Sequence, residues 1–345
     1  MQCTLLIPRL FWPRHAADTV AHGLALPALT TILARSSAER YPAVAPEAWL
    51  CQAFEVERQQ DWPVAPLTLA LDHGDPGDAY WLRADPVHIK VSREGLHLVD
   101  NALFDVSDEE AQALVTKLNE HFAGQDVTFH APNPKRWYAR VGRRPELVTS
   151  ALREVAGKDV QQHLPTGADA LAWHGMFNEI QMLLHDHPLN EAREARGEPE
   201  MNSVWFWGGG TTPAVPGRHF ASVSSNDPTA LALAAAGDTH AVPLPADAGV
   251  WLGEIASAKS NAESHLAVLD DLATAVTYDD PDAWRTRITA LEARWFAPLV
   301  NALGRGHIEA LALVALGEET SCRFSLHRPD LLKFWRRAKA LSAYA

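Results

Sequence analysis

Apolar residues recur every three or four positions in several stretches of the chain, which is the pattern of helices with one buried face. The clearest stretch is 107–124, whose apolar stripe comprises Ala111, Leu114, Val115, Leu118 and Phe122. Ser107 can cap this helix, Glu110 completes a capping box, and Gly124 ends it. The same spacing predicts further helices over 24–40, 168–184, 228–237 and 283–300.

Short apolar runs bounded by turn residues predict strands. Residues 3–8 and 308–316 are such runs, and 66–72 also has a strand-like pattern. Residues 88–100 predict a hairpin with its turn near Glu94-Gly95. The Asp, Gly and Pro residues of 71–80 predict a turn between elements.

Strands that alternate with helices indicate an α/β sheet, and both ends of the chain have this pattern. We therefore predict one α/β domain built from 1–70 and 211–345. Residues 71–210 are predicted to form a smaller α+β domain inserted into it.

Composition narrows the classes of function. The 345 residues carry a formal net charge of −13 without a dense Lys/Arg stripe, so nucleic acid is not an expected partner. Three widely separated cysteines without a CxxC pair favour a reducing, cytoplasmic location. No run approaches about 18 uninterrupted apolar residues, so no membrane association is expected.

Residues 186–210 carry the densest set of candidate binding residues. Asn190 and Arg193 would share a helix face, and Arg196 could join Arg193 in donating to a carboxylate or phosphate. The glycines 208–210 could let backbone amides approach an anion. The alternatives are a simple turn at the glycines and a core role for the tryptophans at 205 and 207.

Other polar residues suggest further sites. Asp72 and His73, with the aspartates at 75 and 78, could ligate a metal, although the same residues suit a tight turn. Arg83 and His88 are candidates for contact with a substrate or partner. His185 and His187 could be loop ligands or structural histidines. Serine and cysteine nucleophiles lack a recognisable motif, so no catalytic residue is assigned.

The segment "HPLNEAREARGEPEMNSVWFWGGG" resembles the corresponding part of the archaeal-type cofactor-independent phosphoglycerate mutases, members of the alkaline phosphatase superfamily. "QQHLPTGADALAWHGMFNEIQMLL" and "DVSDEEAQALVTKLNEHF" are similar to segments of the same family, so the likeness covers about 100–210. It implies an alkaline-phosphatase-like three-layer domain built from both chain ends, with the inserted smaller α+β domain. The whole chain, including "YWLRADPVHI" and "RWYA", looks closest to a proteobacterial offshoot of that family, the RpfE-type regulatory proteins.

The likeness fails at the residues that carry the mutase chemistry. In those enzymes the first strand ends in Asp-Gly, whose Asp binds metal, whereas Arg9-Leu10 stands here. Near the C-terminus the family has Asp-His and a later His, whereas this chain has Gly317-Glu318 and His327. An Arg has the wrong charge for a two-metal site.

We therefore expect a catalytically inactive, mutase-like protein that needs no cofactor and has a regulatory or binding role. Its partner would be a phosphorylated small molecule or a protein, and Asn190, Arg193 and Asn202 could form a vestigial phosphometabolite site. Retention of these residues for structure alone is the other explanation. The alternative function is an active mutase or phosphohydrolase with manganese or zinc at a rearranged site drawn from Asp72, His73 and His327.

Overall fold

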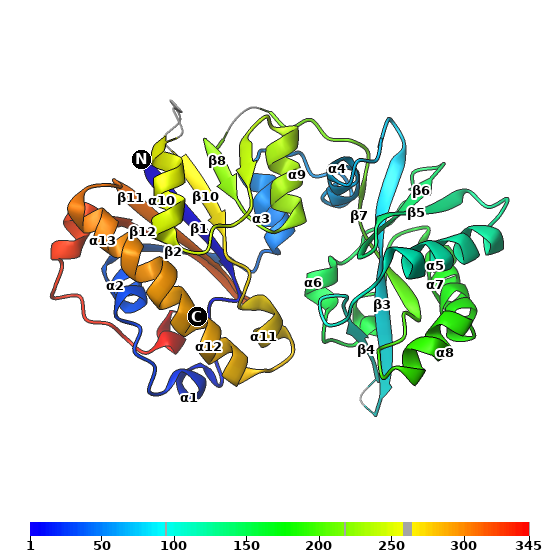
Figure 1. The fold of residues 1–345 in the computed structure, drawn as a ribbon, viewed down its shortest axis with the longest axis horizontal. Coiled ribbons are helices and arrows are strands. Elements are labelled where there is room, and N and C mark those ends of the chain that lie inside the picture. The colour runs from blue at the N-terminus through cyan, green and yellow to red at the C-terminus, as the bar shows by residue number, and fades with distance from the viewer. Residues whose placement is uncertain (94, 217–218, 258–263, 345) are drawn as a thin grey trace. The chain divides into compact units, whose positions relative to one another are not determined.

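The computed structural model describes residues 1–344 except 94, 217–218 and 258–263. The chain divides into two compact units (Figure 1). Unit 1 combines Met1–Phe54 with Pro216–Ala345, and unit 2 is Glu55–Val215. Both chain ends therefore contribute to one unit, and the middle of the chain forms the other.

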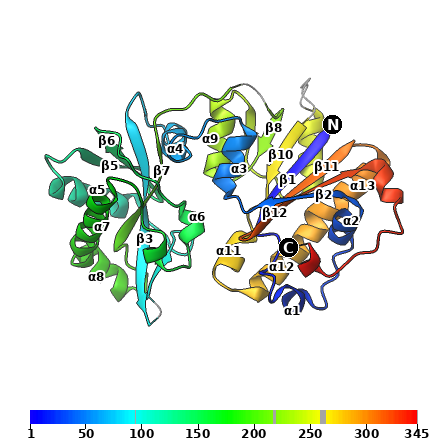
Figure 2. The same cartoon turned by 180° about the vertical axis from the view of Figure 1, so that it is seen from behind.

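Unit 1 is built on a seven-stranded sheet in the order β2-β12-β11-β1-β10-β8-β9. Strands β1, β8, β9, β10 and β11 are parallel, while β12 and β2 are antiparallel at one edge. Both views show β1 in the middle of this sheet, beside β10 (Figures 1 and 2). The strands are β1 (Gln2–Pro8), β2 (Ser37–Pro42), β8 (Ser222–Ser224), β9 (His240–Val242), β10 (Ser264–Val268), β11 (Ala310–Leu316) and β12 (Thr320–His327).

Helices cover this sheet. The unit contains α1 (Ala17–Ala21), α2 (Pro27–Arg35), α3 (Pro46–Ala53), α9 (Pro228–Ala236), α10 (Ala248–Ser257), α11 (Ala273–Thr277), α12 (Pro281–Leu291) and α13 (Ala297–Arg305). A π-helical turn, η2 (Glu292–Phe296), joins α12 to α13, and two short 3-10 turns follow β12, η3 (Arg328–Leu332) and η4 (Leu341–Ala343). Leu5 and Leu6 point to opposite faces of β1 and both are fully buried, so both faces of the sheet are covered.

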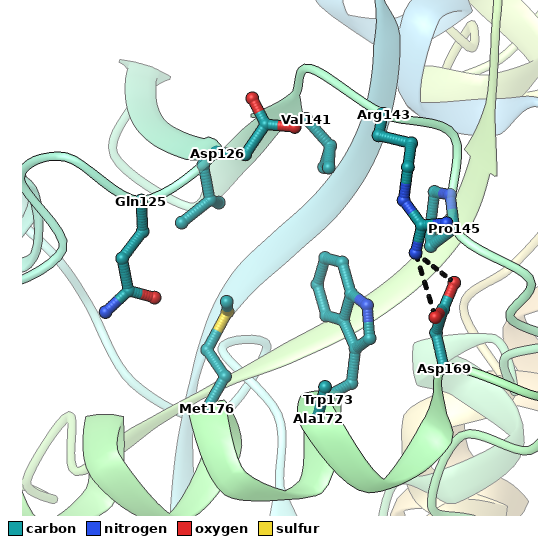
Figure 3. A pocket seen from close by; sticks show the side chains of 10 residues that line it. Gln125, Asp126, Val141, Arg143, Pro145, Asp169, Ala172, Trp173 and Met176 are labelled. Atoms are coloured by element: carbon teal, nitrogen blue, oxygen red, sulfur yellow. Dashed lines mark hydrogen bonds and ion pairs between the residues drawn. The ribbon is translucent and has the colours of Figure 1, made fainter.

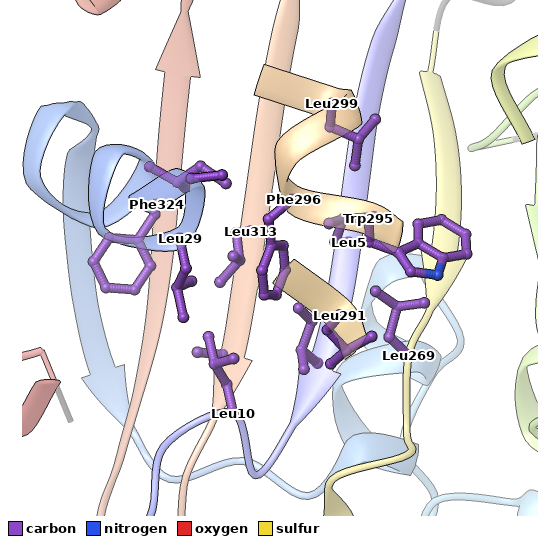
Figure 4. Close-up of a cluster of buried hydrophobic side chains, with 14 of the residues drawn as sticks. Leu5, Leu10, Leu29, Leu269, Leu291, Trp295, Phe296, Leu299, Leu313 and Phe324 are labelled. Carbon is purple, nitrogen blue, oxygen red and sulfur yellow. The ribbon is translucent and has the colours of Figure 1, made fainter. Parts of the chain in front are cut away.

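One large apolar cluster fills the space between the sheet and the helices α2, α10, α12 and α13 (Figure 4). Leu5 and Leu313 come from the strands, and Phe296 and Leu299 come from η2 and α13. Glu292 is buried among them and accepts hydrogen bonds from the first amides of α2, at 2.6 Å from Ala28 and 2.9 Å from Leu29. This carboxylate satisfies amides that the helix cannot pair itself.

Unit 2 is built on an antiparallel sheet in the order β4-β3-β6-β5, with β7 pairing to β3. The strands are β3 (Tyr80–Ser92), β4 (Gly95–Val99), β5 (Val127–Asn133), β6 (Arg136–Val141) and β7 (Ser203–Gly210). The helices are α4 (Val64–Leu71), α5 (Asp108–His121), α6 (Leu152–Val155), α7 (Ala170–His185) and α8 (Pro188–Ala195), with the 3-10 turn η1 (Val160–Gln162). Helices α5 and α7 share one apolar cluster with the sheet, and α4 and α6 contribute to another.

The predicted fold class is confirmed. The capping box at Ser107 and Glu110 is present, and the predicted helix over 168–184 is α7. The hairpin over 88–100 forms from β3 and β4, while Glu94 at its expected turn lies outside the described residues.

Three details differ from the predictions. The helix predicted over 24–40 is α2, which ends at Arg35, and residues 37–40 belong to the strand β2. Residues 66–72 were expected as a strand, but they belong to the helix α4. Residues 64–69 of this helix are all buried, against β3 and β7 among others, so no apolar stripe distinguishes them from a short buried strand. Because α4 packs on unit 2, the border between the units falls at 54/55 and not at the predicted 70/71.

Candidate functional site at the carboxyl edge of the unit 1 sheet

The carboxyl edge of the parallel strands is the expected place for a ligand in unit 1, because open α/β sheets bind ligands outside the carboxyl ends of their strands. Arg9 follows β1, and Gly317-Glu318 follow β11. These strands are neighbours in register, with Pro8 beside Leu316. The edge therefore brings together the two positions at which the sequence departs from the mutase pattern.

Arg9 and Glu318 form an ion pair at this edge. The Arg9 Nη1 atom lies 2.9 Å from the Glu318 Oε1 atom. Arg9 also donates its backbone N–H to the Leu316 carbonyl at 2.8 Å, and its φ is +58°. A left-handed conformation is uncommon for a residue with a side chain, and such strain is concentrated at functional sites. The side chains of Arg9 and Glu318 are 17% and 42% exposed, so the pair is open to solvent.

Three further polar residues of this edge were missed by the sequence analysis. Asp270 follows β10, and Ser225 and Asp227 follow β8. The Asp227 carboxylate accepts the Ala230 amide at 2.9 Å and caps α9, while Ser225 Oγ accepts the Asp227 amide at 2.9 Å. Ser225 and Asp227 are buried, so they hold the first turn of α9. A polar residue directly after a short apolar run was the signal that could have found Asp270, whereas the Ser-Val-Ser sequence of β8 gives no such signal for the other two.

In unit 2, Asn190 and Arg193 lie on α8, as predicted, but both are internal. The Asn190 side chain accepts a hydrogen bond from the Met201 backbone N–H at 2.9 Å and donates one to the Leu184 carbonyl at 2.8 Å. Arg193 is 1% exposed and donates to Glu110, to the Pro199 carbonyl and to the Asp105 carbonyl. These contacts account for the residue pattern of this segment without a ligand.

Asn202 and His88 connect β3 to the segment before β7. The Asn202 side chain donates a hydrogen bond from Nδ2 to the Ile89 carbonyl at 3.0 Å. Its Oδ1 accepts one from the Ile89 backbone N–H at 2.7 Å, so the side chain pairs with β3 as the backbone of another strand would. His88 Nδ1 lies 3.1 Å from the Glu200 carbonyl, which can only accept, so Nδ1 carries the proton. Burial lowers the pKa of His88 and favours its neutral form.

Arg83 is the centre of a buried ionic cluster on β3. Its Nη2 atom lies 2.6 Å from Asp85 Oδ1, and its guanidinium stacks on the rings of Tyr138 and Trp207 at 5.4 and 5.1 Å from their centroids. Trp207 Nε1 donates to Asp85 at 2.8 Å. Burial raises the pKa of Asp85, and the guanidinium opposes this effect. The cluster is closed on itself and presents no donor to a ligand.

The three weak metal candidates are not gathered in one place. Asp72 is held by Arg136, whose Nε lies 2.8 Å from Oδ2, and it also accepts from the Tyr138 hydroxyl. His73 is exposed on the turn after α4, and His327 is 60% exposed in unit 1, where its Nδ1 lies 3.5 Å from Asp330. Within the described residues, no three His, Cys, Asp or Glu side chains are grouped so that they could hold a metal ion.

The glycines at 208–210 do not form the predicted turn after a strand, because they belong to β7 and are buried. A Cβ atom at Gly209 would lie 2.6 Å from the Tyr80 hydroxyl, and one at Gly210 would lie 2.6 Å from Pro63 Cβ. Gly208 has φ +65° and donates its amide to Thr149 Oγ1 at 3.2 Å. Close packing around the strand explains why these three positions carry no side chain.

Two of the cavities found among the described residues are lined by unit 2 alone. The larger, about 570 Å³, is lined by Arg193 and Arg196 together with Asp105, Glu110 and Glu198. Arg196 donates to Glu198 and Glu110, so its donors are already engaged with carboxylates and do not favour a phosphate. The smaller cavity, about 180 Å³, lies beside α7 (Figure 3).

None of the described helices is long and apolar enough to cross a membrane.

Comparisons of sequence identify relatives among the 2,3-bisphosphoglycerate-independent phosphoglycerate mutases. The chain is 25% identical to that of Methanosarcina barkeri over 125 residues, 36% of this chain and 31% of the relative. It is 32% identical to the one from Methanothrix thermoacetophila over 74 residues, 21% and 19% of the two chains. A probable mutase of Geobacter sulfurreducens is 23% identical over 159 residues, 46% and 39% of the two chains. The chain is homologous to these mutases.

Solved structures show the same fold over the whole chain. The cofactor-independent phosphoglycerate mutase of Thermoplasma acidophilum matches with a TM-score of 0.52 at 12% identity, over 100% of this chain and 94% of that one. The PH0037 protein of Pyrococcus horikoshii matches with a TM-score of 0.58 at 12% identity, over 99% and 91%. No family model matches the sequence. In sequence, the chain spans only 19% to 39% of the length of these curated relatives.

Proposed function

We propose that this mutase-like chain is catalytically inactive and acts by binding a phosphorylated metabolite without a metal ion. The observation that carries the proposal is the ion pair between Arg9 and Glu318 at the carboxyl edge of the unit 1 sheet. By the resemblance described above, Arg9 stands where the mutases have a metal-binding Asp, and Glu318 stands where they have a His. A regulatory role of the RpfE type is consistent with such a protein.

The charge of Arg9 argues against a metal at this edge. A guanidinium keeps its charge at every accessible pH and repels a divalent cation. Its positive charge also compensates Glu318, which leaves less net negative charge to attract a metal. Two metal ions would each need about four to six ligands, and the edge would have to supply them around a fixed cation.

The same geometry suits an anionic ligand. A guanidinium binds phosphate and carboxylate groups through two parallel hydrogen bonds. Because Glu318 is 42% exposed, a phosphate from solvent can take its place on Arg9 while the carboxylate turns to water. This exchange is the binding step that we propose, and it needs no group beyond the chain itself.

The alternative is an active mutase or phosphohydrolase with manganese or zinc at a rearranged site. The contacts of Asp72 with Arg136 and Tyr138 do not favour it, because they engage the carboxylate that a metal ion would need. A protein partner in place of the metabolite would be supported if no phosphorylated compound stabilised the chain.

The test is to incubate the purified protein with manganese or zinc, remove unbound ions, and measure both metal content and turnover of 3-phosphoglycerate. The proposal predicts far less than one bound metal ion per chain and no interconversion of phosphoglycerates. An active cofactor-independent mutase is assayed in parallel as the control. Stoichiometric metal together with turnover would establish the alternative.

A further inference from the structure

Large apolar side chains are exposed next to one another in unit 1, on residues 331–340, which we call the aromatic-basic segment. Leu332, Phe334 and Trp335 of this segment are 72%, 78% and 66% exposed. All eleven phenylalanines and twelve tryptophans of the chain lie in the described residues, and every other one is buried or half-buried. Single exposed apolar residues are normal, whereas a group of them marks an interaction site.

The fold holds the aromatic-basic segment in place at the end of α2. Arg336 Nη1 donates to the carbonyls of Arg35 and Ser36 at 3.3 and 3.0 Å. Arg35 in turn donates to the Leu331 carbonyl, and Leu331 packs against the large apolar cluster of unit 1. The two exposed rings therefore lie between two anchored points of the backbone, in the red end of the chain in Figure 1.

The rings of Phe334 and Trp335 form one apolar surface. Their centroids are 5.4 Å apart and their planes meet at 80°, which is an edge-to-face contact. Aromatic residues are enriched in protein interfaces, and tryptophan is among the residues that contribute most to binding there. This surface is therefore suited to an apolar side chain of a partner.

The charges of the aromatic-basic segment are all positive. It contains Lys333, Arg336, Arg337 and Lys339 and no Asp or Glu. Lys333 pairs with Asp330, whereas the other three cations form no ion pair with a carboxylate in residues 1–93, 95–216, 219–257 or 264–344. The chain as a whole carries a net charge of −13, so this segment is a local exception that attracts anions.

We propose that the aromatic-basic segment binds a short acidic peptide segment of a partner protein, in which apolar side chains stand among carboxylates. The carboxylates accept hydrogen bonds from Arg337 and Lys339, and an apolar side chain packs on the rings of Phe334 and Trp335. Residues 332–339 span at most about 25 Å when fully extended, so a single peptide of about eight residues can reach all of these groups.

The net charge favours a short peptide over an extended polyanion. A bilayer or a nucleic acid would face the acidic remainder of the molecule as well as the three unpaired cations. A second copy of the chain carries the same net charge and is repelled in the same way. The inference does not depend on the proposed function, since it concerns a peptide on residues 331–340 and not a phosphate on Arg9.

The test is fluorescence anisotropy with a dye-labelled octapeptide in which glutamates surround one phenylalanine and two leucines. One control peptide has lysines in place of the glutamates, and another has serines in place of the apolar residues. The acidic apolar peptide is expected to bind saturably and at least about tenfold more tightly than either control. Its affinity should fall as the ionic strength is raised, because salt screens the exposed cations.

Two double variants locate the site. Phe334→Ser/Trp335→Ser removes the apolar surface, and Arg337→Gln/Lys339→Gln removes two unpaired cations. Each is expected to weaken binding of the acidic apolar peptide about tenfold or more. All four side chains are exposed, so the melting temperature of the protein should stay unchanged.

The matched control is Lys90→Gln/Arg93→Gln, which removes two exposed cations from the hairpin of β3 and β4 and should bind the peptide like the parent chain. The proposal is overturned by equal binding of the acidic and basic peptides, by no saturable binding, or by unchanged affinity in both double variants at the segment. Tighter binding to phosphatidylserine vesicles or to a single-stranded oligonucleotide would also overturn it. So would a dimer in sedimentation that Phe334→Ser/Trp335→Ser dissociates, because a second copy would then cover the segment.

Discussion

The two units use their charged residues in different ways. In unit 2, the arginines 83 and 193 are buried and every donor contact described for them ends on a carboxylate, a hydroxyl or a carbonyl of the same unit. In unit 1, Arg9 lies at the carboxyl edge of the sheet, 17% exposed, and pairs with a Glu318 that is 42% exposed. Buried charges in unit 2 hold the fold, whereas we propose that the partly exposed pair in unit 1 exchanges its anion with solvent.

This difference explains where the resemblance to the mutases is strongest. The segment 187–210 carries the likeness, and its Asn190, Arg193 and Asn202 all satisfy backbone groups or buried carboxylates of unit 2. The likeness breaks at Arg9 and Glu318, where the chemistry of the mutases would lie. By this resemblance, we expect the chain to keep the residues that build the inserted unit and to differ at those that hold metal in the mutases.

The largest effect is expected from Arg83→Met. The substitution leaves Asp85 buried without its cation, which typically costs about 3–5 kcal/mol of stability. Hydrogen exchange followed by mass spectrometry would report the loss in peptides of unit 2. The double variant Arg83→Met/Asp85→Asn is the control and should lose less. Unchanged exchange in unit 2 would show that the buried cluster is not what stabilises this unit.

Asn190→Ala is expected to lower the stability of the fold by less, about 1–3 kcal/mol. It leaves the buried Met201 N–H and the carbonyls of Leu184 and Met201 without this hydrogen-bond partner. Asn178→Ala, an exposed position on α7, is the matched control and should be neutral. If Asn190→Ala instead abolished binding of a phosphorylated ligand and left the exchange of unit 2 unchanged, Asn190 would be a ligand residue and the contrast between the units would fail.

Acidification should weaken unit 2 in part through His88. Burial lowers the pKa of His88 from its usual 6.5, so the unfolded chain takes up a proton first as the pH falls. The contribution of His88 to stability is therefore present above about pH 6.5 and is lost as the pH falls towards its folded value. His88→Gln should lose less stability between pH 7.5 and 5.5 than the parent chain, and His73→Gln should behave like the parent. A steeper loss in His88→Gln would contradict this sign.

The smallest effect on stability is expected from Arg9→Met. A partly exposed ion pair contributes at most about 1 kcal/mol, so exchange in unit 1 should change little. Glu318→Gln removes the other partner of the ion pair, and it should also change hydrogen exchange in unit 1 only slightly. A loss as large as that of Arg83→Met would mean that the pair at the carboxyl edge is structural, as the pairs in unit 2 are.

Local pattern predicted much of the fold. The helix α5 follows from its stripe and its capping box, and β1 and β11 follow from their apolar runs. Helix α4 could not be recognised, since six consecutive buried residues, 64–69, show no stripe. The sequence could not show that the three glycines belong to β7 and not to a turn. Glycine is needed there because Tyr80 and Pro63 pack against the strand, and this contact exists only in the fold.

From the sequence, the candidate site in unit 1 could be predicted only as two positions that depart from the mutase pattern. The sequence showed that Arg9 and Glu318 replace residues of the mutase pattern, but their pairing depends on the register of β1 with β11. Likewise, nothing in the order of residues brings Val127 and Val141 beside Trp173, because that cavity arises from two strands and a helix that meet only in the fold.

The measurement that tests the central claim most directly is a thermal-shift titration with 3-phosphoglycerate in EDTA, repeated with manganese, on the parent chain and on Arg9→Met. A ligand at about a hundred times its dissociation constant adds roughly 2.7 kcal/mol to the stability of the folded state, which is readily resolved. The account predicts a stabilisation that is the same in EDTA and in manganese and is absent in Arg9→Met. A stabilisation that requires manganese, or one that persists in Arg9→Met, would contradict it.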